Sequence, residues 1–142
     1  MTIQEIQDEI IADFEFFGDW MDKYEYIIQL GKELPMIEEQ YKTEENLIKG
    51  CQSRVWMHAE IRDGRLYFTA DSDAVITKGL VSLVIKVLSS QTPKDIVDAN
   101  LYFVDAIGLS SHLSPTRSNG LLSMIKQIKL YALAYQAKSV ES

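Results

Sequence analysis

Apolar residues recur at steps of three and four positions near the start of the chain, which is the spacing of an amphipathic helix. The first stretch follows Thr2, with Glu5 three residues later, the arrangement of a capping box. We expect Gly18 to lie just past the end of this helix, and a second helix to begin at Asp19 and end at Gly31. The apolar positions of the two helices are Ile3, Ile6, Ile10, Phe14 and Phe17, then Trp20, Tyr24, Ile27 and Ile28.

The second half of the chain predicts three more helices. Ser72 or Asp73 can cap the first of them, and Thr92 and Ser114, each followed by proline, can cap the other two. The apolar positions of the two longer helices are Ile76, Leu80, Leu83, Val84, Val87 and Leu88, then Leu121, Met124, Ile125, Ile128, Tyr131, Ala132 and Tyr135. The apolar run 101–104 is either a third strand or a buried connection, since periodicity does not distinguish the two.

A β-hairpin is predicted between these groups of helices. Apolar and polar residues alternate before and after Asp63-Gly64, the preferred pair for a two-residue type I′ turn. Such a turn places an apolar residue opposite another apolar residue in three pairs on one face of the hairpin. A shift of the register by one residue would destroy that match. The opposed pairs are Ile61 with Leu66, Ala59 with Phe68, and Met57 with Ala70.

The other face of the hairpin is more polar. His58 opposes Thr69 there, and a histidine that simply packs on this face is a commoner case than a ligand or base. Trp56 shares the face, so we expect a helix to cover part of it. The stretch 35–50 is acidic and weakly periodic, which favours a surface loop with one helical turn.

Composition and charge narrow the function. The chain has 142 residues, enough to bury a core, and we expect one domain over residues 1–142. A net charge of −7 argues against nucleic acid and anionic membranes and favours a partner with a basic face. No apolar run approaches the ~20 residues of a membrane span. The N-terminus lacks the pattern of a signal peptide, so we expect a cytoplasmic protein.

Cys51 is the only cysteine, and its surroundings are those of a loop. Gly50 precedes it, and the nearby cations Lys49 and Arg54 favour a thiolate if they stay close in the fold. A thiol available for chemistry and a buried apolar filler both fit this setting. One cysteine and two histidines without ligand spacing predict no metal site.

Arg117 stands in the first turn of the last predicted helix, where a cation opposes the helix dipole. This misfit predicts a partner for Arg117, either an ion pair within the protein or a functional anion. His112, two residues before the cap, lies in a polar loop and has no assigned role.

Four segments in this order resemble the SufE family of sulfur-acceptor proteins. The second segment holds Cys51 and the fourth holds both His112 and Arg117. The segments are Trp20-Met21-x-x-Tyr24-x-Tyr26-Ile27-Ile28-x-Leu30-Gly31-x-x-Leu34-Pro35, Gly50-Cys51-Gln52-Ser53-x-Val55-Trp56, Asp71-Ser72-Asp73-Ala74-x-Ile76-x-Lys78-Gly79-Leu80 and His112-Leu113-Ser114-Pro115-x-Arg117-x-x-Gly120-Leu121.

The resemblance implies a single SufE-like domain with an α+β fold of the SufE/IscU-like type, a small antiparallel sheet packed with several helices. It implies a sulfur carrier that is not itself an enzyme and needs no cofactor. Cys51 would accept persulfide sulfur from a pyridoxal-phosphate cysteine desulfurase resembling SufS, stimulate that enzyme, and relay the sulfur to an iron–sulfur scaffold resembling SufB. We expect a monomer or weak homodimer, with the thiol sheltered on a movable loop.

Supporting roles follow from the same segments. Gln52, Ser53, Asp73, His112 and Arg117 are expected to line the cysteine loop or the partner surface. Two other classes of function stay open. One is a cysteine-nucleophile hydrolase with His112 or His58 as the base. The other is a non-catalytic interaction module with an inert Cys51.

Overall fold

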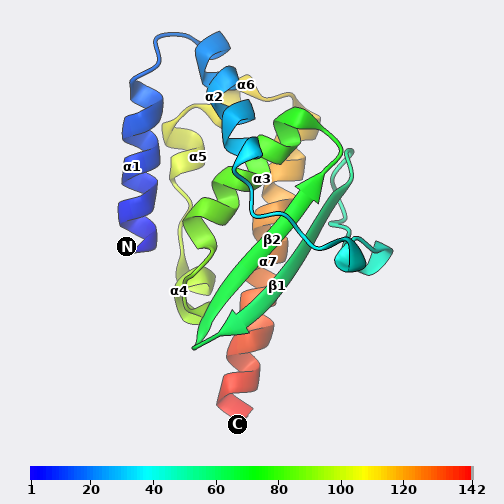
Figure 1. The fold of residues 1–142 in the computed structure, drawn as a ribbon. Helices are drawn as coiled ribbons and strands as arrows, with labels where there is room; N and C mark the ends of the chain where they lie inside the picture. Colours follow the sequence, from blue (N-terminus) through cyan, green and yellow to red (C-terminus); the bar gives the residue numbers. More distant parts are fainter. Residues whose placement is uncertain (142) are drawn as a thin grey trace.

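The computed structural model describes residues 1–141 and has the α+β architecture predicted from the sequence (Figure 1). A two-stranded antiparallel hairpin is combined with helices from both halves of the chain. The helices are α1 (Ile3–Glu15), α2 (Trp20–Lys32), α3 (Val75–Leu88), α4 (Pro93–Asp98), α5 (Phe103–Ala106), α6 (Leu109–His112) and α7 (Pro115–Glu141). The strands are β1 (Val55–Arg62) and β2 (Arg65–Ser72). Two short 3₁₀ turns, η1 (Glu39–Tyr41) and η2 (Glu44–Asn46), lie between α2 and β1.

The hairpin has the predicted register. Arg62 opposes Arg65, and the three apolar pairs expected from the alternation all form. Asp63 and Gly64 have φ angles of 51° and 77°, so both turn residues take the left-handed conformation that a type I′ turn requires. The hairpin prediction is therefore confirmed in both register and turn.

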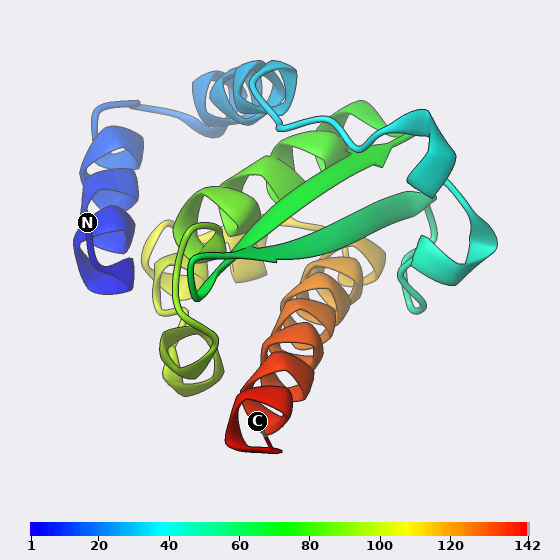
Figure 2. The same ribbon diagram turned by 60° about the horizontal axis from the view of Figure 1, so that its bottom comes forward.

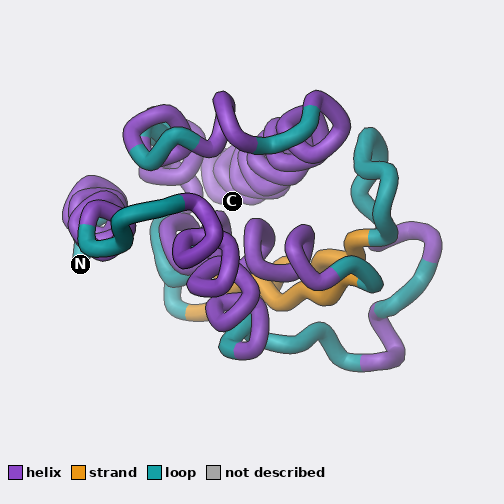
Figure 3. Tube along the Cα trace, turned by 90° about the horizontal axis from the view of Figure 1, so that it is seen from above, coloured by secondary structure: helices purple, strands orange, loops and turns teal. Residues whose placement is uncertain are grey.

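The apolar face of the hairpin forms the centre of the core. Helices α3 and α7 lie on one side of the hairpin, and the segment between α2 and β1 lies on the other (Figures 2 and 3). Met57 and Phe68 are almost fully buried, and the ring of Phe68 packs 6.4 Å from that of Tyr131 in α7. The α7 helix therefore runs beneath the sheet and carries its N-terminal half toward the start of β1.

The polar face of the hairpin is covered without a helix. Tyr41 of η1 stacks on His58 with ring centroids 3.8 Å apart. Leu47 forms a β-bridge with Trp56, and the ammonium of Lys42 lies 5.5 Å from the centre of the Trp56 ring. The expected covering helix is thus wrong, because two 3₁₀ turns and a loop fill that place. His58 is a packing residue, as the commoner reading of its position predicted.

Both edges of the two-stranded sheet carry short bridges to other parts of the chain. On the β2 side, Met36 bridges with Ala70, and Gln91 bridges with Leu66. The amide of Ala70 donates to the carbonyl of Pro35 at 3.0 Å. The run 101–104, which the sequence left as a strand or a connection, is a connection that leads into α5.

Three predicted helix boundaries are wrong: the end of α1 at Gly18, the cap of α3 at Ser72 or Asp73, and the end of α2 at Gly31. Gly18 is not a left-handed helix end, because α1 ends near Phe16 and Gly18 has no positive φ. Helix α3 is preceded by Ala74 without a side-chain cap, so neither Ser72 nor Asp73 caps it.

Four other predicted caps are confirmed. The side chains of Thr2, Asp19, Thr92 and Ser114 each accept a hydrogen bond from a backbone amide of the first turn.

Gly31 does not end α2 but lies inside it, at the crossing with α3. A Cβ on Gly31 would lie 3.0 Å from the amide nitrogen of Gly79. A Cβ on Gly79 would overlap the carbonyl oxygen of Ile27 and lie 2.5 Å from its Cγ2. The two glycines therefore let the backbones of α2 and α3 approach more closely than side chains allow.

No helix within residues 1–141 combines the length and the apolar character that crossing a membrane requires.

We expect Gly79→Ala to destabilise the protein because the new methyl group cannot fit without separating α2 from α3. Overpacking of this kind costs about 2 kcal/mol, more than the ~1 kcal/mol that alanine contributes to helix propensity. Urea unfolding measures the difference. The control is Gly18→Ala, where nothing lies within 4 Å of the new Cβ. Equal stability of the two variants would contradict the tight crossing.

Candidate functional site

Cys51 lies in a loop that passes directly against α7. Gly50 has a φ of 92°, a conformation that L side chains rarely adopt. A Cβ on Gly50 would overlap the Oγ of Ser123 and lie 3.2 Å from its Cβ. Glycine is thus required before Cys51 both by the backbone turn and by the closeness of α7.

A second glycine stands on the other side of this contact. Cys51 donates its thiol hydrogen to the carbonyl oxygen of Gly120, with 3.5 Å between sulfur and oxygen. A Cβ on Gly120 would lie 3.6 Å from the sulfur, within van der Waals contact. Glycine inside a helix is about 1 kcal/mol less favourable than alanine. Here it leaves the α7 backbone open to the thiol.

The Cys51 side chain borders a pocket of about 340 Å³ between the loop, α3 and the first turns of α7. Three of the residues predicted to support Cys51 line the same pocket: Gln52, Ser53 and Arg117. Its remaining lining residues are Thr77, Leu80, Ser114, Thr116, Gly120 and Met124. The lining contains one cationic side chain and no carboxylate, which makes the pocket electrostatically suited to an anion.

The resting thiol is sheltered and protonated at neutral pH. Cys51 is partly buried, and this burial raises the pKa of its thiol above the ordinary value. The bond to the Gly120 carbonyl also favours the protonated form, because only the thiol has a hydrogen to donate. Lys49 and Arg54 are both exposed and do not offset the burial. The sequence predicted a thiolate only if these two cations stayed close to the thiol, and burial alone sets the direction of the pKa shift in this loop position.

The two ends of the cysteine loop are anchored by hydrogen bonds. Before the loop, the amide of Ile48 donates to the carbonyl of Val55 at 2.9 Å. After it, the amide of Arg54 donates to the Oδ1 of Asp73 at 3.1 Å, and the amide of Asp73 donates back to the Arg54 carbonyl at 3.3 Å. Asp73 thus lies outside the pocket and holds the end of the loop that leads into β1.

His112 lies apart from Cys51. Its ring stacks on Trp20 at 3.9 Å between centroids, and its Nδ1 lies 3.0 Å from the carbonyl oxygen of Gly108. The hydroxyl of Tyr24 donates to the carbonyl of His112 at 2.6 Å. These contacts fix α6 against α2, two residues before the Ser114 cap that begins α7. His112 therefore supports the pocket wall at a distance and is not one of its lining residues.

Arg117 is the cation of the pocket. Its backbone amide donates to the Oγ of Ser114 at 3.3 Å, which is the expected cap of α7. Among the side chains that the structure describes, the ion pairs join other residues, and none includes Arg117. The predicted ion pair for Arg117 is thus not formed, and Arg117, an exposed residue, lines the pocket shared with Cys51.

Sequence reasoning missed the part that Gly120 and Thr77 play in forming the pocket. A glycine in the second turn of a predicted helix was a usable signal, since it lowers helix propensity without ending the helix. Thr77 carried no such signal. It is 8% exposed, and only the packing of α3 against the loop brings it beside Cys51.

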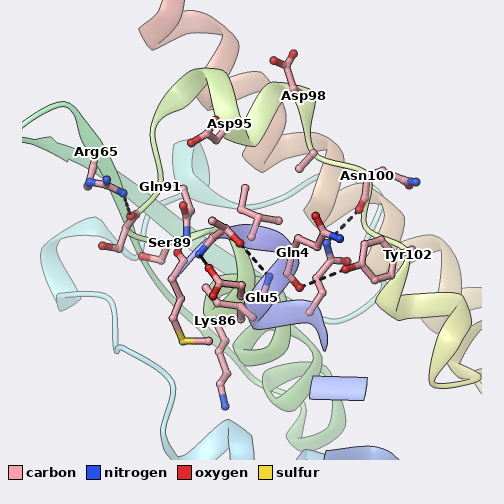
Figure 4. Close-up of a pocket in the computed structure, with 17 residues that line it drawn as sticks. Gln4, Glu5, Arg65, Lys86, Ser89, Gln91, Asp95, Asp98, Asn100 and Tyr102 are labelled. Carbon is pink, nitrogen blue, oxygen red and sulfur yellow. Dashed lines mark hydrogen bonds between the residues drawn. The ribbon is translucent and has the colours of Figure 1, made fainter. Parts of the chain in front are cut away.

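A larger hollow lies at the opposite end of the hairpin, around the N-terminus (Figure 4). Its volume is about 1080 Å³, and its walls are tied together by hydrogen bonds. Arg65 donates to the carbonyl of Ser90 at 2.8 Å, and Gln91 donates to that of Met1 at 3.2 Å. The labelled side chains mix both charges and include neither a thiol nor an imidazole. This hollow lies between α1 and the hairpin, at the end of the hairpin away from Cys51.

Comparisons with known proteins identify the family of this chain. The family model for SufE, described as an Fe-S metabolism associated domain, matches residues 8–132. An uncharacterised SufE-like protein of Rhizobium meliloti (strain 1021) is 45% identical over 128 residues, which cover 86% of this chain and 91% of that protein. One of Rhizobium etli is 41% identical over 127 residues, covering 86% of each.

A solved structure extends the comparison to the fold. The solution structure of a hypothetical protein from Thermus thermophilus superposes with a TM-score of 0.76 and covers 96% of this chain and 97% of its own. At 16% identity it shows the fold alone. Because the family match spans most of the chain and the Rhizobium relatives align along nearly the same length, the protein belongs to the SufE family, which is associated with iron–sulfur metabolism.

Proposed function

We propose that Cys51 is a sulfur carrier. It accepts persulfide sulfur from a pyridoxal-phosphate cysteine desulfurase resembling SufS and relays it to an iron–sulfur scaffold resembling SufB. The observation that carries this proposal is the sheltered pocket that Cys51 shares with Arg117 and with no carboxylate. Membership of a family associated with iron–sulfur metabolism supports it.

The transfer is a thiol–persulfide exchange. The Cys51 thiolate attacks the outer sulfur of the donor persulfide, a new S–S bond forms at Cys51, and the S–S bond of the donor breaks. The donor cysteine leaves as a thiolate, so no oxidant or reductant is consumed. A thiolate of the scaffold then repeats the exchange on Cys51. The carrier thus works in partnership with an enzyme and performs no net reaction of its own.

The single thiol suits this chemistry. A second cysteine close by would attack the persulfide and release its sulfur as sulfide while forming a disulfide. Cys51 is the only cysteine of the sequence, so this loss within the chain is excluded. Shelter in the pocket limits over-oxidation of the bound sulfur. Arg117 and the first turn of α7 stabilise the negative charge of the persulfide.

Delivery and acceptance require the loop to open, because partly buried Cys51 is protonated and only part of its side chain is open to a donor. We assign this movement to the loop between Ile48 and Arg54, whose ends are held by Val55 and Asp73. Binding of the desulfurase releases the loop, exposes the thiol and lowers its pKa toward the ordinary value. Gln52 and Ser53 move with Cys51, whereas His112 keeps the pocket wall in place. The same contact stimulates the desulfurase by removing its persulfide.

The two other classes of function fit the geometry less well. A cysteine hydrolase needs a base within hydrogen-bond reach of its nucleophile. The two histidines of the sequence stack on Tyr41 and Trp20, and the thiol hydrogen bonds to a backbone carbonyl. If Cys51 were inert, the presence of Gly50 and Gly120 beside its sulfur, at the pocket next to α7, would have no functional explanation. The carrier hypothesis uses both features.

The first test is a mass measurement. Incubation with a SufS-like desulfurase and cysteine should add the mass of one sulfur atom to this protein, and a reductant should remove it. Cys51→Ala should gain nothing, because no other thiol is present. Circular dichroism shows that the variant is folded. If the wild-type mass stays constant while the desulfurase turns over, the carrier proposal is wrong. A substrate-dependent acyl adduct at Cys51 would instead indicate a hydrolase.

The second test follows the alkylation rate of Cys51 by iodoacetamide against pH. Only the thiolate reacts, and burial raises the thiol pKa, so the rate should rise at a higher pH than that of a free cysteine, about 8.5. Asp73→Ala removes one anchor of the loop. Losing a bond worth about 1 kcal/mol should speed alkylation at neutral pH about five-fold.

Asp73→Asn is the matched control, because its side-chain oxygen still accepts a hydrogen bond from the amide of Arg54. Its alkylation rate should stay near that of the wild type. If the alanine and asparagine variants react equally fast, the Asp73 anchor does not control access to Cys51.

A further inference from the structure

An apolar groove lies between the outer face of α7 and the end of α4, away from the Cys51 pocket. Its volume is about 400 Å³. Three of its leucines are unusually open to solvent, with exposed fractions of 61% for Leu122, 48% for Leu130 and 52% for Leu133. The other lining residues are Val97, Ile125, Lys126 and Lys129. Grouped apolar side chains of this kind on a soluble protein mark an interaction surface.

The α7 side of the groove is positively charged although the protein is acidic, whereas α4 on the other side carries Asp95 and Asp98. Residues 115–138 contain four basic side chains and no acidic one, within a chain of net charge −7. Lys126 is exposed at the edge of the groove, and the ammonium of Lys129 donates to the carbonyls of Val97 and Ala99. An occupant of the groove should therefore be apolar at its centre and acidic around it.

The same chain offers such a surface at the corner between α1 and α2. Phe16 is 86% exposed and Met21 is 74% exposed, so both project from this corner. The acidic residues Glu15, Asp19 and Asp22 adjoin them in the sequence. Residues 1–22 carry seven acidic side chains and no lysine or arginine. Lys23, whose ammonium lies 4.9 Å from the centre of the Trp20 ring, is the one cation beside them in the sequence. The corner is thus an apolar projection with a net negative charge around it, complementary in both respects to the α7 side of the groove.

We propose that Phe16 of one copy of this chain binds in the α7 groove of a second copy. A cavity of about 150 Å³ lined by aliphatic side chains already accommodates benzene, so the groove has room for the phenyl ring. Lys126 and its neighbouring cations then face the acidic residues of the partner's corner. In Figure 1 the corner between α1 and α2 lies at the top of the molecule, whereas α7 runs from its middle to its lower end. The contact therefore joins copies head to tail.

Charge favours this arrangement over contact between two α7 helices. In a symmetric α7 pair, the lysines of one copy would face those of the other, and like charges placed together oppose association. A contact made by one aromatic side chain and a few rim charges is small, and small interfaces are weak and transient. We therefore expect self-association that is visible only in concentrated solution and that weakens as salt is added.

Sedimentation velocity of the full chain from about 10 µM to about 1 mM covers the range of a weak contact. The weight-average mass should rise with concentration and fall back toward the monomer at high salt. Phe16→Glu and Leu133→Glu should each weaken association about 30-fold or more, since each replaces a central apolar anchor by a charge. Val75→Glu is the control, because Val75 is 62% exposed and lies in neither surface.

Mixing the two variants tests the pairing itself. The Phe16→Glu chain keeps an intact groove, and the Leu133→Glu chain keeps an intact corner. The mixture should form a one-to-one dimer, although each variant alone is monomeric. Association that survives Phe16→Glu would point to an α7 pair and overturn the proposal. A wild type that stays monomeric at every concentration, or a mixture of folded variants that does not associate, would overturn it as well.

Discussion

The contact between the cysteine loop and α7 depends on glycine, through a turn of the backbone that glycine adopts readily and other residues rarely do. Gly50 turns the chain with a positive φ beside Ser123, and Gly120 exposes the helix backbone to the sulfur of Cys51. A side chain at Gly50 would be strained by the positive φ and would displace the hydroxyl of Ser123. The pocket, the shelter of the thiol and its raised pKa all follow from this approach. The α2–α3 crossing at Gly31 and Gly79 applies the same principle to hold the helices that support the hairpin.

The sequence predicted those parts of the fold that neighbouring residues determine. The hairpin register follows from alternation and from Asp63-Gly64, and four helix starts follow from caps three residues ahead of their amides. It failed where distant segments meet. Gly31 was taken as a helix end because the composition of one helix does not reveal the second glycine that faces it across the crossing. The cover of Trp56 by 3₁₀ turns was missed for the same reason.

In the candidate site, too, features set by neighbouring residues were predictable and features set by distant segments were not. Cys51 and its place before the first strand were predictable from local composition and from the family motif. Its protonation was not, because the thiol pKa depends on burial against α7, nearly seventy positions away in the chain. His112 shows the opposite case. It shares a motif segment with Arg117 and was therefore expected near the cysteine loop or the partner surface, but its ring stacks on Trp20. Residue type indicated the chemistry, and packing decided which residues share a cavity.

The bridges along the hairpin edges limit how other proteins can bind here. A two-stranded sheet ordinarily leaves two rows of backbone donors and acceptors open to pairing with an additional strand. Leu47 occupies part of the β1 edge, and Met36 and Gln91 occupy parts of the β2 edge. Strand addition at these positions is blocked, which also protects the sheet from edge-to-edge aggregation. At these positions a partner therefore binds through loops and helix surfaces, where side chains set specificity and binding can be reversed without unzipping a sheet.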